Sequence, residues 1–141
     1  MDIIPNLFPA LPEIVLLISS LVILLAGVFY EKNNLRNSMR FSLFILFVLL
    51  FVIIMTNQSP KETFNGLFVV NPFTSFSKLM IILSSIFSIF LIKPWLKNET
   101  INIYEVPVLI LFSTLGMMMM LSANDLVSLY IGLELQSLSL Y

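Results

Sequence analysis

The chain has 141 residues, of which 59% are apolar and 11% charged, and its mean hydropathy is +1.03. Soluble domains contain about 45–50% apolar and about 25% charged residues, so this composition excludes a soluble globular domain and indicates a membrane protein. The formal net charge of −1 argues against nucleic acid as a partner. The chain has no Cys and no His, which removes thiolate chemistry and the commonest metal ligands, so any redox cofactor is expected on another chain.

The first residues show no targeting peptide, because no Lys or Arg precedes Lys32. A secretory signal requires a basic first region, and a mitochondrial presequence is rich in Arg. We therefore expect insertion by the compartment that makes the protein. Phe, Ile, Leu and Asn are frequent and Ala and Gly are scarce, as in AT-rich mitochondrial genomes. The mitochondrial inner membrane is the expected location, with a bacterial cytoplasmic membrane as the alternative.

Apolar runs along the chain predict the fold class, an all-α integral membrane protein. A membrane crossing requires about 20 apolar residues, so the chain has room for roughly five transmembrane helices. We expect one membrane domain over residues 1–141, with helices at 12–30, 39–57, 72–92, 103–121 and 125–141. The fifth helix is expected to be short, and the segment 58–71 is expected to be a loop.

Helix-start signals support these boundaries. Pro12 and Pro72 suit a first helical turn, where the missing N–H has no partner to lose. Asp125 is the expected N-cap of the fifth helix. The turn at 122–125 is so short that the fourth and fifth helices must be antiparallel neighbours. Lys93 and Pro94 are expected to end the third helix.

The basic residues predict the orientation in the membrane. Five of the seven fall in the turns after the first and third runs: Lys32, Arg36, Arg40, Lys93 and Lys97. The opposite side carries Lys61, with Lys78 a short way into its helix. Because cytoplasmic or matrix loops are enriched in Lys and Arg, the N-terminus and the segments 58–71 and 122–125 are expected to face outward.

Glu134 is the candidate functional residue, because it is a carboxylate inside an apolar helix. It lies nine residues after Asp125, which is roughly 13–14 Å of helix and places it near the middle of a hydrocarbon core about 30 Å thick. A charge there costs at least about 2.5–3.5 kcal/mol, so the residue should face a partner or an internal water path. Tyr130, Ser137 and Tyr141 fall on the same helical face. A proton or ion site and a buried acid that only binds helices together both fit this pattern.

The other ionisable residues have simpler interpretations. Glu13 and Glu105 lie at expected helix starts, where an acidic side chain favours the helix dipole. Lys78 is expected to extend its long side chain to the outer interface. The Met run at 117–120 is expected to fill gaps in helix packing.

The last third of the chain resembles subunit 2 of respiratory complex I, the proton-translocating NADH:quinone oxidoreductase. The similar segments are 105–116, 123–126 and 130–141, and the block GLELQSLSLY at 132–141 is the most specific. Residues 11–14, Leu-Pro-Glu-Ile, also resemble the opening of that family's first helix. Over the remainder of the first hundred residues the similarity is only in the order of helices.

This resemblance implies a function, a site and a set of partners. It implies an antiporter-like, multi-helix subunit with an outward N-terminus, in which Glu134 matches the proton-translocating glutamate of the fifth helix, paired with a lysine two helices later. NADH, FMN, iron–sulfur clusters and quinone are expected on other subunits, with no cofactor and no metal site on this chain. The implied partners are the other membrane subunits of complex I and the lipid bilayer.

The length of the chain differs from the family pattern, because the sequence stops before any of the family's membrane lysines. We therefore expect the rest of the subunit, beyond Tyr141, to be needed for a complete proton path. Two alternatives stay open on the residues alone. One is a subunit of a multi-subunit cation/proton antiporter, and the other is a membrane scaffold in which Glu134 only binds helices together.

The predicted orientation can be tested with single cysteines, because the chain has no Cys of its own. We expect Cys at Asn34 to react with a membrane-impermeant thiol reagent from the matrix or cytoplasmic side, and Cys at Asn65 from the outer side. Labelling of both positions from the same side would show that the helix count is wrong.

Overall fold

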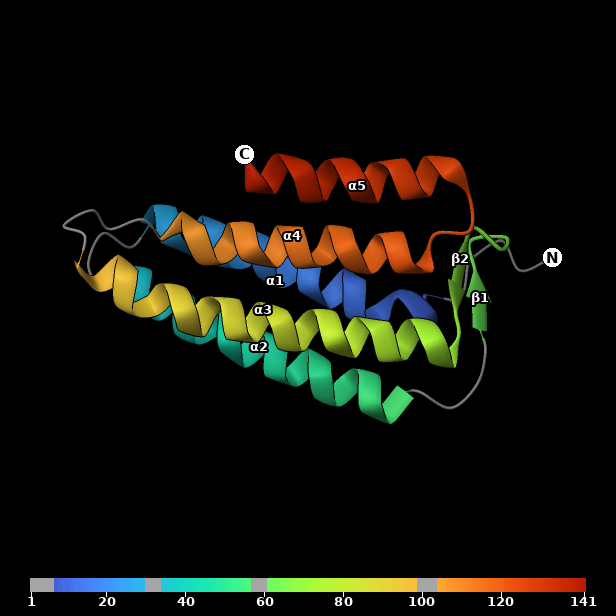
Figure 1. Ribbon diagram of the computed structural model, residues 1–141, viewed down its shortest axis with the longest axis horizontal. Helices are drawn as coiled ribbons and strands as arrows, with labels where there is room; N and C mark the ends of the chain where they lie inside the picture. The colour runs from blue at the N-terminus through green and yellow to red at the C-terminus, as the bar shows by residue number, and fades with distance from the viewer. Residues whose placement is uncertain (1–6, 30–33, 57–60, 99–103) are drawn as a thin grey trace.

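The computed structural model describes residues 7–29, 34–56, 61–98 and 104–141. Its elements in chain order are η1 (Phe8–Ala10), α1 (Leu11–Phe29), α2 (Asn34–Thr56), β1 (Lys61–Thr63), β2 (Phe68–Val70), α3 (Pro72–Asn98), α4 (Glu105–Ser122) and α5 (Leu126–Leu140). Helices α1 to α4 run side by side as a bundle, and α5 lies along α4 (Figure 1). The predicted all-α membrane class is confirmed.

Within the described residues, the helices long and apolar enough to cross a membrane lie at Phe8–Phe29, Arg36–Thr56, Pro72–Pro94 and Glu105–Ser122. Helix α5 is apolar but shorter. The hairpin, the start of α3 and the turn between α4 and α5 lie at one end of the bundle (Figure 1). These are the segments for which the distribution of Lys and Arg predicts the outer side.

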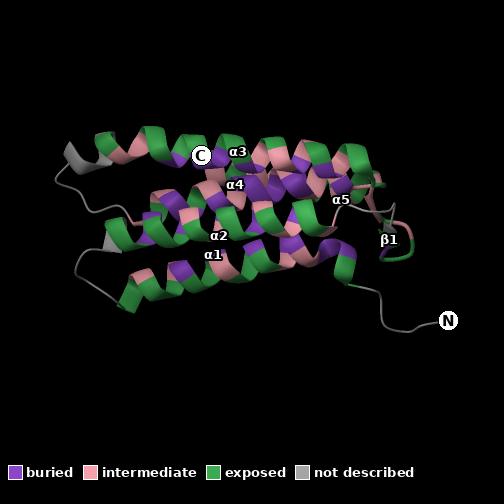
Figure 2. Cartoon of the chain, turned by 90° about the horizontal axis from the view of Figure 1, so that it is seen from below, coloured by how far each residue is buried: buried purple, intermediate pink, exposed green. Residues whose placement is uncertain are grey.

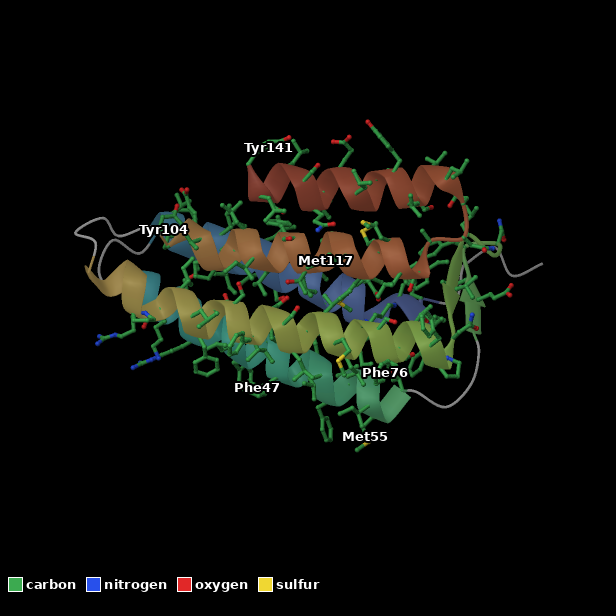
Figure 3. All side chains as sticks on the ribbon, in the orientation of Figure 1. Phe47, Met55, Phe76, Tyr104, Met117 and Tyr141 are labelled. Atoms are coloured by element: carbon green, nitrogen blue, oxygen red, sulfur yellow. The ribbon has the colours of Figure 1, made fainter. Side chains whose placement is uncertain are left out.

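Helices α1, α2 and α3 each bury a narrow stripe whose members are mostly three or four residues apart, whereas α4 is buried on several sides. In α2 the stripe is Met39, Ser42, Leu46, Leu49 and Ile53. This spacing places side chains on one face of an α-helix, so the stripes of neighbouring helices meet in a common core. The exposed positions between them are also apolar, as a lipid-facing surface requires, and exposed faces line the outside of the bundle (Figure 2). Phe47, Met55 and Phe76 are examples (Figure 3).

A hydrogen bond between hydroxyl groups joins α3 and α4 inside the core. Ser85 Oγ and Thr114 Oγ1 are 2.9 Å apart, and Thr114 Oγ1 also donates to the backbone oxygen of Ile110 at 2.6 Å. Polar contacts of this kind contribute to helix association in lipid, where no hydrophobic effect drives the helices together. The central helix α4 contacts α1, α2, α3 and α5.

The segment expected to be a loop contains a β-hairpin. Strand β1 pairs with β2 in antiparallel register, with Lys61 opposite Val70 and Thr63 opposite Phe68. The turn contains positive φ angles at Phe64, Asn65 and Gly66, and strands of three residues are too short for an alternating pattern to reveal them. The backbone N–H of Asn124 donates to Leu67 O at 3.0 Å, so the turn before α5 holds the hairpin in place.

Two helix boundaries differ from the expected ones by more than two residues. Helix α2 begins at Asn34 rather than at residue 39, and α3 continues through Pro94 to Asn98 rather than ending at residue 92. Polar residues can continue a helix past the hydrocarbon, because water satisfies their side chains there. Pro94 removes one backbone hydrogen bond, which a helix tolerates more easily near its end, where the freed carbonyl can reach water.

Helices α4 and α5 pack closely through two glycines, Gly116 and Gly132. A Cβ atom added to Gly116 would lie 2.7 Å from both the backbone N of Gln136 and the backbone O of Gly132. One added to Gly132 would lie 3.0 Å from the backbone O of Gly116 and 2.8 Å from Met120 Cγ. Small residues let helix backbones approach in this way, and the expected antiparallel packing of these helices is confirmed.

We expect Gly116→Ala to separate α5 from α4, because its methyl group meets backbone atoms that cannot rotate away. Overpacking of this kind costs about 1–3 kcal/mol. The measurement is thermal unfolding of the purified protein in detergent. Leu133→Ala is the matched control, since Leu133 is exposed and adjacent to Gly132. A Gly116→Ala protein as stable as the parent would contradict the close contact.

Candidate functional site

Glu134 lies in the middle of α5, on the side away from α4. The side of α5 that meets α4 contains Gly132 and Gln136, as their approach to Gly116 shows. Glu134 is two residues from each, roughly 200° around the helix, and therefore points elsewhere. It is half-buried. Tyr141, on the same helical face, is fully exposed at the end of α5 (Figure 3).

The close partners of Glu134 come from its own helix. The Tyr130 side chain lies one turn earlier on the same helical face. Ser137 Oγ donates to the backbone oxygen of Glu134 at 3.1 Å. No Lys or Arg forms an ion pair with Glu134 within residues 7–29, 34–56, 61–98 and 104–141. The geometry thus leaves this carboxylate facing away from the bundle.

Asp125 is the N-cap of α5, as predicted. Its Oδ2 accepts hydrogen bonds from the backbone N–H groups of Val127 and Ser128, both at 3.2 Å. A side-chain hydrogen bond from Ser128 is the main cause that lowers the pKa of Asp125 below its ordinary value. The cap therefore carries a negative charge at neutral pH, which favours the N-terminal end of a helix.

A second ionisable site lies inside the bundle, and the sequence did not predict it. Lys78 Nζ of α3 forms an ion pair with Glu13 Oε1 of α1. Only 2% of Lys78 and 5% of Glu13 is exposed. The expectation that Lys78 extends to the outer interface is wrong. Glu13 does lie in the first turn of α1, but its carboxylate is directed to α3, so helix capping does not explain it.

The signal that could have revealed this pair is the stripe on which each residue lies. Glu13 precedes the buried positions Leu16 and Ser20 at helical spacing, and Lys78 precedes Ile82 and Ser85 in the same way. Both charges therefore lie on the inward faces of their helices. The long, flexible and charged side chain of Lys78 suits the membrane interface when its helix is considered alone. The buried partner on α1 becomes apparent only when α1 and α3 are considered together.

The surroundings of the pair are partly aromatic and partly polar. The Phe68 ring of β2 lies with its centroid 5.0 Å from Lys78 Nζ, a distance at which an aromatic ring attracts a cation. Lys78 also lines a cavity of about 30 Å³, together with Thr56, Ser75 and the apolar residues Phe8, Pro9, Pro12, Ile53 and Val70. A cavity of this size has room for about one water molecule.

The fold and these two sites define a class, a multi-pass α-helical membrane protein with ionisable groups inside its spans. Comparisons with known proteins narrow that class. No family model matches the chain. It is 42% identical over 138 residues to NADH-quinone oxidoreductase subunit N of Parvibaculum lavamentivorans, covering 98% of the chain and 29% of that protein. It is also 42% identical over 135 residues to NADH-quinone oxidoreductase subunit N of Rhodospirillum rubrum, covering 94% of the chain and 28% of that protein.

The chain is thus similar over nearly its whole length to the N-terminal portion of NADH-quinone oxidoreductase subunit N, and the resemblance predicted from its last third is confirmed. It spans less than a third of the length of these relatives. A solved structure of respiratory complex I from Thermus thermophilus with bound aureothin contains a chain of the same fold. Its TM-score is 0.77 and its identity 22%, over 92% of this chain and 28% of the other.

We expect Lys78→Met to destabilise the bundle strongly, because it leaves the Glu13 carboxylate buried without its partner. Breaking a buried pair from one side costs about 3–5 kcal/mol, whereas replacing both partners by apolar residues of similar volume is often neutral. Glu13→Leu combined with Lys78→Met should therefore recover most of the stability. Thermal unfolding of the purified protein measures both. Equal stability of Lys78→Met and the parent would show that the ion pair does not form.

Proposed function

We propose that this chain is the N-terminal, five-helix part of a membrane subunit of a proton-translocating NADH:quinone oxidoreductase, and that Glu134 exchanges protons in it. The observation that carries the assignment is the similarity to subunit N across almost the entire chain. NADH oxidation, with FMN and iron–sulfur clusters, and quinone reduction are assigned to other subunits. The absence of Cys and His from this chain agrees with that division.

The chemistry proposed for Glu134 follows from its place in α5. A carboxylate inside a membrane span is costly when charged, so its proton affinity depends strongly on nearby charge. Glu134 faces away from α4, on a side of α5 that the bundle α1–α4 does not cover. A basic residue beyond Tyr141 or on a neighbouring subunit could approach it from there. Approach of a cation favours release of the proton, and withdrawal favours its uptake.

The membrane is proposed to be an energy-converting one, the mitochondrial inner membrane or a bacterial cytoplasmic membrane. The relatives named above are bacterial. The Phe-, Ile-, Leu- and Asn-rich composition favours the mitochondrial membrane. Proposed partners are the other membrane subunits of the complex and the remainder of this subunit.

The test replaces Glu134 in the complete complex. We expect Glu134→Gln to assemble normally, since Gln keeps the shape and hydrogen bonds of Glu. Proton translocation and the NADH:quinone turnover coupled to it should fall roughly tenfold or more, because Gln cannot exchange a proton. The measurements are proton uptake by inverted membrane vesicles, NADH oxidation, and complex content on a native gel.

Glu105→Gln is the matched control, because Glu105 is an exposed acid in the first turn of α4. It should leave pumping unchanged. Normal pumping with normal complex content in Glu134→Gln would reduce Glu134 to a packing residue. A cation dependence of transport without NADH oxidation would instead favour the antiporter alternative.

A further inference from the structure

Stability alone does not account for the buried pair of Glu13 and Lys78. Two charges inside a helical bundle lose their hydration, and an apolar pair of equal volume often stabilises a fold as well or better. The pair is not at a solvent boundary, since both side chains are almost completely buried. An ionisable pair inside a membrane span is therefore more readily explained by a function than by packing.

The carboxylate of Glu13 is incompletely satisfied. Oε1 faces Lys78 Nζ, whereas Oε2 is buried and receives no hydrogen bond from the residues that the structure describes. A carboxylate oxygen that receives no hydrogen bond still has its lone pairs available as acceptors. Oε2 can therefore bind one additional proton.

Lys78 connects this carboxylate to the water-sized cavity. It forms the ion pair with Glu13 and is at the same time one of the cavity-lining residues. The other lining residues, from η1, α1, α2, β2 and α3, carry no charge, and Thr56 and Ser75 supply hydroxyl groups that can hold a water molecule. Among the residues that line this cavity, Lys78 is the ionisable one.

The cavity lies at the end of the bundle covered by the hairpin. Lys78 is six residues after Pro72 at the start of α3, which is roughly 9 Å of helix and places Lys78 in the half of the membrane nearer the hairpin. The Phe68 ring of the hairpin lies over its ammonium group. Phe68 also forms a β-bridge with Ala123, so the same strand contacts both the pair and the turn that starts α5.

We propose that Glu13 and Lys78 form a second proton-exchange site, which passes protons between the membrane interior and the water-sized cavity beneath the hairpin. In the resting pair Glu13 is a carboxylate and Lys78 an ammonium. A proton that reaches Glu13 binds at Oε2, and Lys78 then releases one proton to water in the cavity. Transfer of the Glu13 proton to the neutral amine restores the ion pair. One proton enters and one leaves, with no redox step.

This inference rests on the proposed function, because it assumes that the protein translocates protons. Its test uses the complete complex carrying Glu13→Leu with Lys78→Met, which removes both charges and preserves side-chain volume. We expect normal complex content but a roughly tenfold or greater loss of proton translocation per NADH oxidised. Glu62→Gln is the control, because Glu62 is an exposed acid on β1. It should pump normally.

A purely structural pair predicts a different result, since the double variant would then regain both assembly and pumping, and that outcome overturns the proposal. A second measurement covers the case of poor assembly. In infrared difference spectra of the purified complex between two pH values, the C=O stretch of a protonated buried carboxyl group should be present in the parent and absent in Glu13→Gln. An unchanged band in that variant would also overturn the proposal.

Glu134→Gln in parallel separates the two hypotheses. If it abolishes pumping while the double variant pumps normally, the proposed function stands and the second site fails. If neither variant affects pumping, the second site and the proposed role of Glu134 both fail.

Discussion

Lipid hydrocarbon offers no hydrogen-bond partners. Each polar group within a membrane span must therefore find its partner inside the protein. The helices satisfy their backbone groups internally. Side-chain hydroxyls meet that constraint through contacts such as Ser85 with Thr114 and through bonds to their own helix backbone. Charged groups need such a partner most, and the buried charges of Glu13 and Lys78 find it in each other, joining α1 to α3 inside the bundle. The arrangement of α1, α2 and α3 at the hairpin end is consistent with this requirement.

Features that depend on one helix or one turn could be predicted from the sequence. The Asp125 cap follows from residue type and position, and the antiparallel packing of α4 on α5 follows from a turn too short for any other geometry. The membrane class follows from composition. Each of these rests on local chemistry, for which the sequence contains the necessary information.

Features that depend on two distant segments could not be predicted. The partnership of Glu13 with Lys78 requires the inward stripes of α1 and α3 to face each other at the same depth, and no single helix reveals that. The hairpin is stabilised by contacts with Ala123 and Asn124, more than fifty residues later in the chain, rather than by its short strands. The position of Glu134 in α5 was predicted, and its role as a proton-exchange residue stays a prediction.

The hairpin contacts both the buried pair and the turn that precedes the helix of Glu134. Phe68 lies over Lys78 and bridges to Ala123, and Asn124 Nδ2 donates to Gly66 O at 2.8 Å. Asp125, the next residue, caps the helix that carries Glu134. A displacement of α5 would therefore pull on the hairpin, and the hairpin contacts the ammonium group of the buried pair. Because packed elements move as units rather than deforming continuously, this contact gives a physical route by which a change of charge at Glu134 could alter the surroundings of Lys78.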